Sequence, residues 1–179
     1  MEVRTAVGSD VENLASPGAL LFLCGRAGAG KSTLARQMSV DHKAILICED
    51  QWLVHLFDGA SSIEEYIERR GRVRKLLMEH VPPIITAGHT VVLDFSGNTV
   101  RDRQWVRSVF ESVGARHELH YIVADESLCR RRIQERNRTK PEGIYWGEVS
   151  ADMFDAVNMY FQPPTAEEGF TIVEHRYSA

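Results

Sequence analysis

Short apolar runs alternate with amphipathic segments along most of the chain. Each run holds four to six residues. The first, residues 19–24, is apolar without interruption, as expected for a strand that is covered on both faces. This alternation predicts a parallel sheet with helices on both sides. The runs that we expect to form strands are residues 19–24, 44–48, 90–94, 119–123 and 170–173.

The segments between these runs carry apolar residues at helical spacing. Ser61 and Ser62 are typical of a helix start, and Pro82 with Pro83 is expected to interrupt the helix that follows. The expected helices cover about residues 31–39, 63–80, 99–113, 126–137 and 150–161.

A length of 179 residues fits one domain, so we expect residues 1–179 to form a single unit. Residues 1–17 are polar and contain Ser-Pro-Gly, which predicts a loosely ordered leader. Residues 137–149 contain Pro141 and two glycines, which favours an ordered loop or a small lid over a regular element.

Composition narrows the possible functions. Hydrophobic residues make up 44% of the chain, and the net charge of −4 does not suggest a general nucleic-acid coat. The chain has no apolar run long enough for a membrane span and no signal-like start, so we expect a cytoplasmic protein. The three cysteines show neither a CxxC pair nor a zinc spacing. Cys24 and Cys48 lie at the ends of apolar runs, which predicts that they are buried, reduced thiols.

The strongest motif lies between the first expected strand and the first expected helix. It reads GRAGAGKS, which matches GxxxxGK[ST], a loop whose backbone amides surround phosphates. Lys31 should reach the β- and γ-phosphates, and the Ser32 hydroxyl should bind Mg²⁺. We therefore expect ATP and Mg²⁺ as cofactors. The expected nucleotide contacts are Gly25, Arg26, Ala27, Gly28, Ala29, Gly30, Lys31, Ser32 and Thr33.

Signatures of other nucleotide-binding classes are missing from the sequence. It holds no N-K-x-D segment that would read guanine and no LSGGQ-like segment of transporter ATPases. The chain is also too short for the extra helical domain of ring ATPases. A compact kinase is the class that remains.

Two acidic residues follow the second expected strand, at the edge of the sheet where ligands bind in doubly wound folds. Transfer to a hydroxyl needs a carboxylate that orients the acceptor and takes its proton. We assign this catalytic role to Asp50, with Glu49 as the competing base. Alternatively, Asp50 could cap a short helix over residues 51–57.

Asp94 ends the third expected strand. An apolar strand that ends in aspartate resembles the second phosphate-site motif of P-loop proteins, which predicts that Asp94 holds Mg²⁺ together with Ser32. Alternatively, Asp94 caps the loop that follows. Asn98 is expected to contact the substrate or to cap the helix that starts at Thr99.

Other residues near these strand ends could meet the acceptor. Trp52 could stack on a planar substrate or belong to the core, and Arg101 lies close enough along the chain to contact the acceptor. Arg103 and Arg107 are four residues apart, and we expect them to form a solvated helix face.

A basic segment spans residues 130–140. In a nucleic-acid binder it would contact the backbone, and in a small kinase it would cover the phosphates and neutralise charge in the transition state. Arg132 and Arg136 share a helix face, so we expect both to be catalytic. Arg138 is expected to contact the nucleotide. Arg130 and Arg131 should be solvated or paired with Glu126 and Glu135 at the surface.

The chain resembles one group of enzymes in the order of four features, which are the phosphate loop, Asp50, Asp94 with Asn98, and the arginine segment. The chain is similar over most of residues 19–161 to small AAA-type P-loop kinases related to zeta toxins, chloramphenicol phosphotransferase and polynucleotide kinases. The resemblance implies an α/β, three-layer P-loop fold like that of nucleotide kinases. It also implies a five-stranded parallel sheet in the order 2-3-1-4-5 with a small lid, Mg²⁺·ATP as donor and a hydroxyl acceptor. By this resemblance Asp50 matches the acceptor-activating carboxylate, and Arg132, Arg136 or Arg138 the lid arginines.

One position departs from the group's pattern. Many relatives carry an arginine three residues after the activating aspartate, where this chain has Leu53, which cannot hold a phosphate. We therefore expect an ATP-dependent phosphotransferase that acts on a hydroxyl of a small molecule. A nucleic-acid 5′-hydroxyl kinase and an ATP-hydrolysing switch remain as alternatives.

Overall fold

The computed structural model describes residues 18–57 and 63–178. The expected leader, residues 1–17, and the expected helix cap at Ser61 and Ser62 lie outside the described part. Five strands form one sheet in the order β2-β3-β1-β4-β5, and every neighbouring pair is parallel, as expected. The strands are β1 (Ala19–Cys24), β2 (Ile45–Cys48), β3 (Val91–Ser96), β4 (Arg116–Ala124) and β5 (Ile172–Tyr177).

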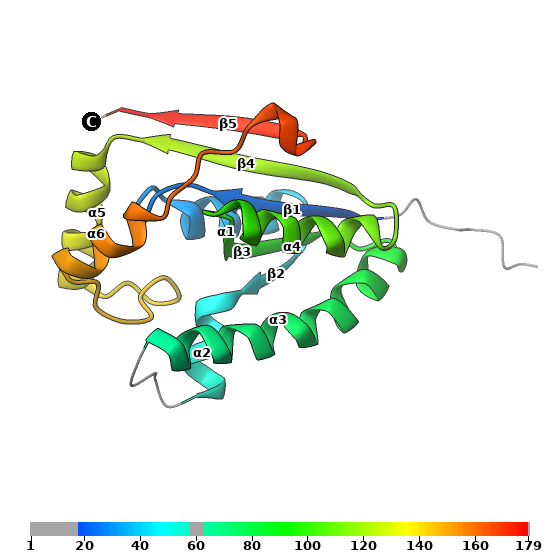
Figure 1. Ribbon diagram of the computed structural model, residues 1–179, viewed down its shortest axis with the longest axis horizontal. Helices are drawn as coiled ribbons and strands as arrows, with labels where there is room; N and C mark the ends of the chain where they lie inside the picture. The colour runs from blue at the N-terminus through cyan, green and yellow to red at the C-terminus, as the bar shows by residue number, and fades with distance from the viewer. Residues whose placement is uncertain (1–17, 58–62, 179) are drawn as a thin grey trace, which may run out of the picture.

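Helices connect the strands and cover both faces of the sheet, which gives the predicted three layers. α3 and α4 lie side by side over one face, while α1 and α5 pack on the other with Phe154 of α6 (Figure 1). The helices are α1 (Lys31–Asp41), α2 (Glu49–Leu56), α3 (Ile63–Thr86), α4 (Val100–Glu111), α5 (Glu126–Thr139) and α6 (Ala151–Met159), with a short 3-10 helix, η1 (Ala166–Glu168).

The sequence of the central strand β1 is apolar without interruption because both of its faces are covered. Leu20 and Phe22 belong to the core beneath α3 and α4, whereas Leu21 and Leu23 belong to the core on the opposite face. All four are nearly or completely buried. Burial of each such side chain contributes roughly 1.5–3 kcal/mol, so apolar residues are favoured on both faces of this strand.

The carboxyl ends of the strands meet at one edge of the molecule. In Figure 1 the arrowheads point to the edge where α2, α5 and α6 gather. β2 and β3 are in register there, with Cys48 opposite Asp94, so Glu49 and Asp50 emerge beside Asp94. The topology therefore brings the acidic residues to the end of β1, where the phosphate loop starts.

The predicted interruption at Pro82 and Pro83 is wrong, because α3 runs through both residues to Thr86. Each interior proline removes a helical hydrogen bond. The neighbouring Val81 and Ile85 are fully buried, and their packing against the sheet holds this last turn in helical form. α3 is long but rich in charges, and no helix in the described residues is apolar enough over a sufficient length to cross a bilayer.

The expectation of a solvated face is wrong for Arg103, whose side chain is completely buried. Its guanidinium donates to both carboxylate oxygens of Glu168, at 2.6 and 2.7 Å, and to the carbonyl oxygens of Gly97 and Gln162. Arg107 is partly exposed and pairs with Glu111. The chain after α6 lies over this part of α4, which explains the burial of Arg103.

The three cysteines are free and buried, as expected for Cys24 and Cys48. Burial raises the pKa of Cys24 to about 11 and that of Cys48 to about 12. Thiols with such pKa values remain protonated near neutral pH.

Two histidines join the last two strands. The Nδ1 atom of His120 lies 2.9 Å from Nε2 of His175, and its Nε2 atom lies 3.1 Å from Glu118. Burial lowers the pKa of His120, and the nearby His175 lowers it further, against the opposing effect of Glu118. The folded state therefore binds a proton at this site less readily than the unfolded chain does.

We expect the melting temperature to fall as the pH decreases from about 7.5 to about 5.5, because the unfolded chain takes up the proton first, near pH 6.5. Melting curves at both pH values test this, with His120→Gln as a variant that cannot titrate at this position. The pH dependence should be weaker in the variant, and an equal dependence in both proteins contradicts the assignment.

Candidate functional site

The phosphate loop has the backbone geometry that its glycines permit. Gly28 and Gly30 have positive φ values of 76° and 110°, a region that other residues rarely adopt. A Cβ atom at Gly28 would also collide with the carbonyl oxygen of Cys129 in α5. The loop leads into α1, whose N-cap is Gly30, so the positive end of the helix lies at the loop. Thr33 is exposed on the first turn of α1.

Lys31 lies across the loop and is within electrostatic reach of two carboxylates. Its ammonium donates to the carbonyl oxygens of Gly25, at 2.6 Å, and Arg26, at 3.0 Å. Burial lowers the pKa of Lys31, and the negative charges of Asp94 and Asp50 oppose this effect. The structure thus brings together three of the residues that the sequence analysis selected from separate segments.

Ser32 and Asp94, the two residues expected to hold Mg²⁺, lie next to each other. Burial raises the pKa of Asp94, while a hydrogen bond from the Ser32 hydroxyl and the charge of Lys31 oppose the shift. Mg²⁺ prefers oxygen ligands and commonly uses one or two protein groups together with phosphates and water. A hydroxyl beside a carboxylate at the end of the phosphate loop fits this requirement.

Asp50 is the second residue of α2, and the N-cap of this helix is Cys48. The alternative reading of Asp50 as a helix cap is therefore wrong. The residue is exposed at the surface, but its carboxyl group lies among other protein atoms. Desolvation of the carboxylate by these atoms, together with the charge of Asp94, raises the pKa of Asp50, and the charges of Lys31 and Arg136 oppose this shift.

Glu49 points the opposite way, into the protein, and is 3% exposed. It accepts a hydrogen bond of 2.9 Å from Arg74 and lies 2.9 Å from Nε of Arg70. Both arginines also pair with Asp102 of α4, at 2.7 and 3.3 Å. Two arginines and two carboxylates thus neutralise one another where α2, α3 and α4 meet.

The arginines of α5 divide into two groups. Arg132 donates to the carbonyl oxygen of Ala29 in the phosphate loop, at 2.6 Å. Arg136 is partly buried, and burial lowers its pKa against the opposing charge of Asp50. Arg138 instead pairs with Glu135 on the exposed side of the helix.

Arg130 pairs with Glu126 at 2.8 Å, as expected, and also with Asp155 of α6. This leaves Arg132 beside the phosphate loop and Arg136 toward Asp50, so the helix face that these two share is the one turned to the site.

The segment after α5, where the sequence predicts a lid, connects three parts of the molecule. Arg36 of α1 donates to the carbonyl oxygen of Gly143, and the side chain of Asn137 makes two hydrogen bonds to the backbone of Val149, at 2.8 and 3.2 Å. The Trp146 ring lies 6.0 Å from that of His55 in α2. The segment therefore reaches from α5 to the helix that carries Asp50.

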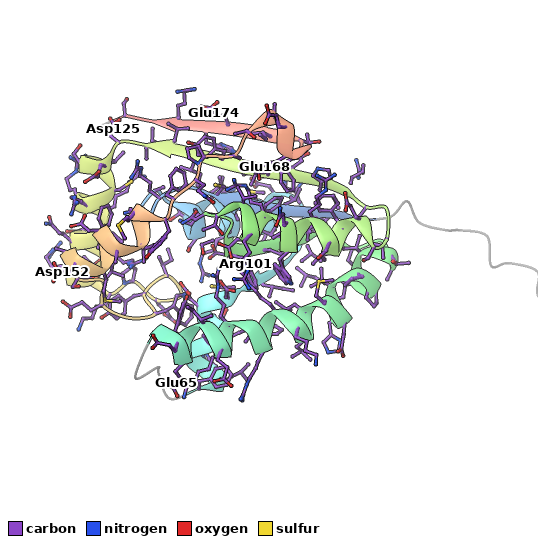
Figure 2. All side chains as sticks on the ribbon, viewed as in Figure 1. Glu65, Arg101, Asp125, Asp152, Glu168 and Glu174 are labelled. Atoms are coloured by element: carbon purple, nitrogen blue, oxygen red, sulfur yellow. The ribbon has the colours of Figure 1, made fainter. Side chains whose placement is uncertain are left out.

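The expected substrate residues occupy different surroundings. Trp52 is partly buried and packs against the core, next to the buried Leu53. Asn98 is 7% exposed, and its Oδ1 accepts a hydrogen bond of 3.2 Å from the backbone N–H of Gly25. Arg101 is exposed on the first turn of α4, on the side of the helix toward α3 (Figure 2). Substrate contact by these residues stays a prediction.

Sequence reasoning missed a contact that holds the phosphate loop from α6. The Oδ1 atom of Asn158 accepts a hydrogen bond of 3.0 Å from the backbone N–H of Ala27. The two residues are 131 positions apart, and α6 belongs to no motif. Neither periodicity nor spacing carries a signal for a contact of this kind.

Comparison with solved structures gives the same fold. A candidate kinase from Chloroflexus aurantiacus is 17% identical, with a TM-score of 0.71 over 90% of this chain and 89% of the other. Kti12 of Chaetomium thermophilum, solved with ADP-AlF3, is 14% identical, with a TM-score of 0.65 over 87% and 88% of the two chains. The APS kinase CysC of Mycobacterium tuberculosis, solved with AMPPNP and APS, is 17% identical, with a TM-score of 0.59 over 90% and 88%.

No curated protein sequence is significantly similar to this one. The sequence profile of a family described as AAA domain, however, matches residues 20–164, which is most of the chain. The phosphate loop, the strand order and the structural neighbours agree with this match. The chain therefore belongs to this AAA domain family and has the fold of the small P-loop kinases.

Proposed function

We propose that the protein transfers the γ-phosphoryl group of ATP to a hydroxyl group of a small molecule. The observation that carries this proposal is the position of Asp50. Asp50 is an exposed residue at the start of α2, directly after β2, and its carboxylate is within electrostatic reach of Lys31 in the phosphate loop and Arg136 in α5. A carboxylate in this place can hold an acceptor hydroxyl beside the terminal phosphate.

Each of the site residues has a separate role in the transfer. The loop amides and Lys31 bind the phosphates, and Asp50 takes the proton from the acceptor hydroxyl as its oxygen attacks the γ-phosphorus. The new bond joins this oxygen to phosphorus, the bond to the β-phosphate oxygen breaks, and ADP leaves. Arg132 and Arg136 offset the negative charge that develops. Mg²⁺ held by Ser32 and Asp94 would offset charge on the phosphate oxygens.

Asp50 suits the role of base better than Glu49 does. The carboxylate of Glu49 is buried between Arg70 and Arg74, where an acceptor cannot reach it. The raised pKa of Asp50 also makes it a stronger base than an ordinary aspartate.

The acceptor side of the site favours an uncharged molecule. Arg70 and Arg74 of α3 are neutralised by Glu49 and Asp102. Arg69 and Arg72 also pair with carboxylates along the same helix. Leu53, where many relatives carry an arginine, is buried in the core. These arginines therefore offer little positive charge to a phosphorylated acceptor or a nucleic-acid strand.

The fate of labelled phosphate tests the proposal. The protein is incubated with Mg²⁺ and ATP labelled with ³²P at the γ-position, once with a pool of small metabolites and once with oligonucleotides that carry a 5′-hydroxyl. Label in a small hydroxyl compound supports the proposal. Label on the oligonucleotide alone, or only in free phosphate, contradicts it in favour of a polynucleotide kinase or an ATP-hydrolysing switch.

A further inference from the structure

The chain that follows the predicted lid returns to the phosphate loop and contacts it directly. Asn158, near the end of α6, accepts the backbone N–H of Ala27, and the Arg26 guanidinium lies 5.4 Å from the centre of the Phe161 ring. α6 and the residues after it therefore form one wall of the nucleotide site, although the motif that defines this site ends at Ser32.

The hydrogen bond fixes the orientation of the Asn158 side chain. Because Oδ1 takes the proton of a backbone amide, the Nδ2 group must be the other branch of the side chain. This Nδ2 atom is buried, and it has no hydrogen-bond partner among the described residues. Buried amide donors are nearly always paired in folded proteins, so an unpaired one beside a binding loop indicates a ligand as its partner.

The surroundings of Asn158 indicate the chemistry of this partner. The adjoining loop presents backbone amides, the ammonium of Lys31 and the guanidinium of Arg132. These groups are donors or cations, so together they attract an anion with several acceptor oxygens. A phosphate group has this chemistry.

We propose that Asn158 is a nucleotide-binding residue, which donates a hydrogen bond from Nδ2 to a phosphate oxygen of ATP while its Oδ1 positions the loop. The proposal rests on nucleotide binding at the phosphate loop, and it does not depend on which acceptor receives the phosphoryl group.

The structure around Asn158 holds it in place relative to the loop. Beyond α6, the backbone N–H of Gln162 donates to the carbonyl oxygen of Asn98 at 2.8 Å, and Asn98 accepts the N–H of Gly25 at 3.2 Å. The buried Arg103 donates to the carbonyl oxygen of Gln162 at 2.8 Å. The first residues of the loop are thus tied to the C-terminal segment at two points, which pre-organises the donor before the nucleotide binds.

Asn158→Asp separates the two roles of this side chain. Aspartate keeps an oxygen that can accept the N–H of Ala27, but it replaces the donor by a negatively charged oxygen. We expect the melting temperature of the free protein to change by no more than about 2 °C, because the contact with the loop remains. We expect the dissociation constant of Mg²⁺·ATP, measured by calorimetry, to rise roughly tenfold or more, as is typical when a hydrogen bond to a charged group is lost.

Met159→Asp is the matched control, since it places the same charge on the next residue, whose side chain is 72% exposed. Asn158→Asp should weaken ATP binding at least about fivefold more than this control does. A smaller difference between the two variants overturns the proposal.

A second measurement needs no variant and therefore does not depend on whether Asn158→Asp folds. In the ¹⁵N-labelled wild-type protein, the Nδ2 resonances of Asn158, assigned through the backbone, should shift on titration with Mg²⁺·ATP and saturate together with binding. Resonances that stay in place while ATP binds to the loop contradict the proposal. A failure to transfer phosphate to any hydroxyl would leave both readouts valid, so it would refute the proposed function alone.

Discussion

Asp50→Asn is expected to lower the rate of phosphoryl transfer about 10²–10⁴-fold while the affinity for Mg²⁺·ATP stays close to that of the wild type. Asparagine has nearly the same shape as aspartate, but it cannot take the proton of the acceptor hydroxyl. Initial rates of ³²P transfer to the identified acceptor give the first quantity, and calorimetric titration with ATP gives the second.

The exposed neighbour Gln51 supplies the control, because Gln51→Ala alters the same helix turn without removing a carboxylate. Near-normal turnover in Asp50→Asn would remove Asp50 from the mechanism, and an equal loss in both variants would indicate a general disturbance of α2. Glu49→Gln should instead act on stability, because Glu49 bridges Arg70 and Arg74.

The raised pKa of Asp50 also predicts a pH dependence. A base must be deprotonated to act, so the transfer rate should fall as the pH decreases through this raised pKa, above the ordinary range of an aspartate. Glu49→Gln should leave this profile in place. A profile that disappears in Glu49→Gln and persists in Asp50→Asn would assign the base to Glu49.

Arg103→Met should reduce the free energy of unfolding by about 3–5 kcal/mol, because it leaves Glu168 without its buried partner and two carbonyl oxygens without their donor. For a domain of this size, this corresponds to a decrease in melting temperature of roughly 6–20 °C. Urea unfolding, followed by circular dichroism, gives the free energy, and thermal unfolding gives the melting temperature.

Arg72→Met is the control, because it removes an arginine that is exposed where Arg103 is buried. Arg72 forms a 2.6 Å ion pair with Glu68 on the surface of α3. We expect this control to change stability by less than about 1 kcal/mol. Equal effects of the two substitutions would show that burial of the Arg103 pair is not what stabilises the C-terminal segment.

The parts of the fold that the sequence predicted are those set by local patterns. The strand around Leu20 to Leu23 is apolar at every position because both faces of the sheet are covered. The burial can therefore be recognised in the sequence as an uninterrupted apolar run. The phosphate loop is likewise contiguous, so its residue types and spacing are visible without a structure. Asp50 and Asp94 could be placed because parallel strands end at the same edge of the sheet.

The parts that escaped prediction depend on partners far away in the chain. Four-residue spacing indicated a solvated face for Arg103, but Glu168, 65 residues later, closes over it and supplies its charge partner. Pro82 and Pro83 stay helical because the adjacent Val81 and Ile85 are packed into the core. Asn158 reaches the phosphate loop only through the packing of α6. Local propensity carries no information about any of these contacts.

Calorimetric titration of Mg²⁺·ATP into the wild-type protein and Lys31→Met tests the central claim most directly, with the exposed Lys75→Met as a control. The ammonium of Lys31 lies on the loop, within electrostatic reach of Asp94 and Asp50, so its loss should weaken binding roughly 10–100-fold, while the control binds as the wild type does. Saturable binding to one site that Lys31→Met weakens is the predicted result. No saturable binding to the wild type, or equal affinity in Lys31→Met, would contradict the assignment of this loop as the nucleotide site.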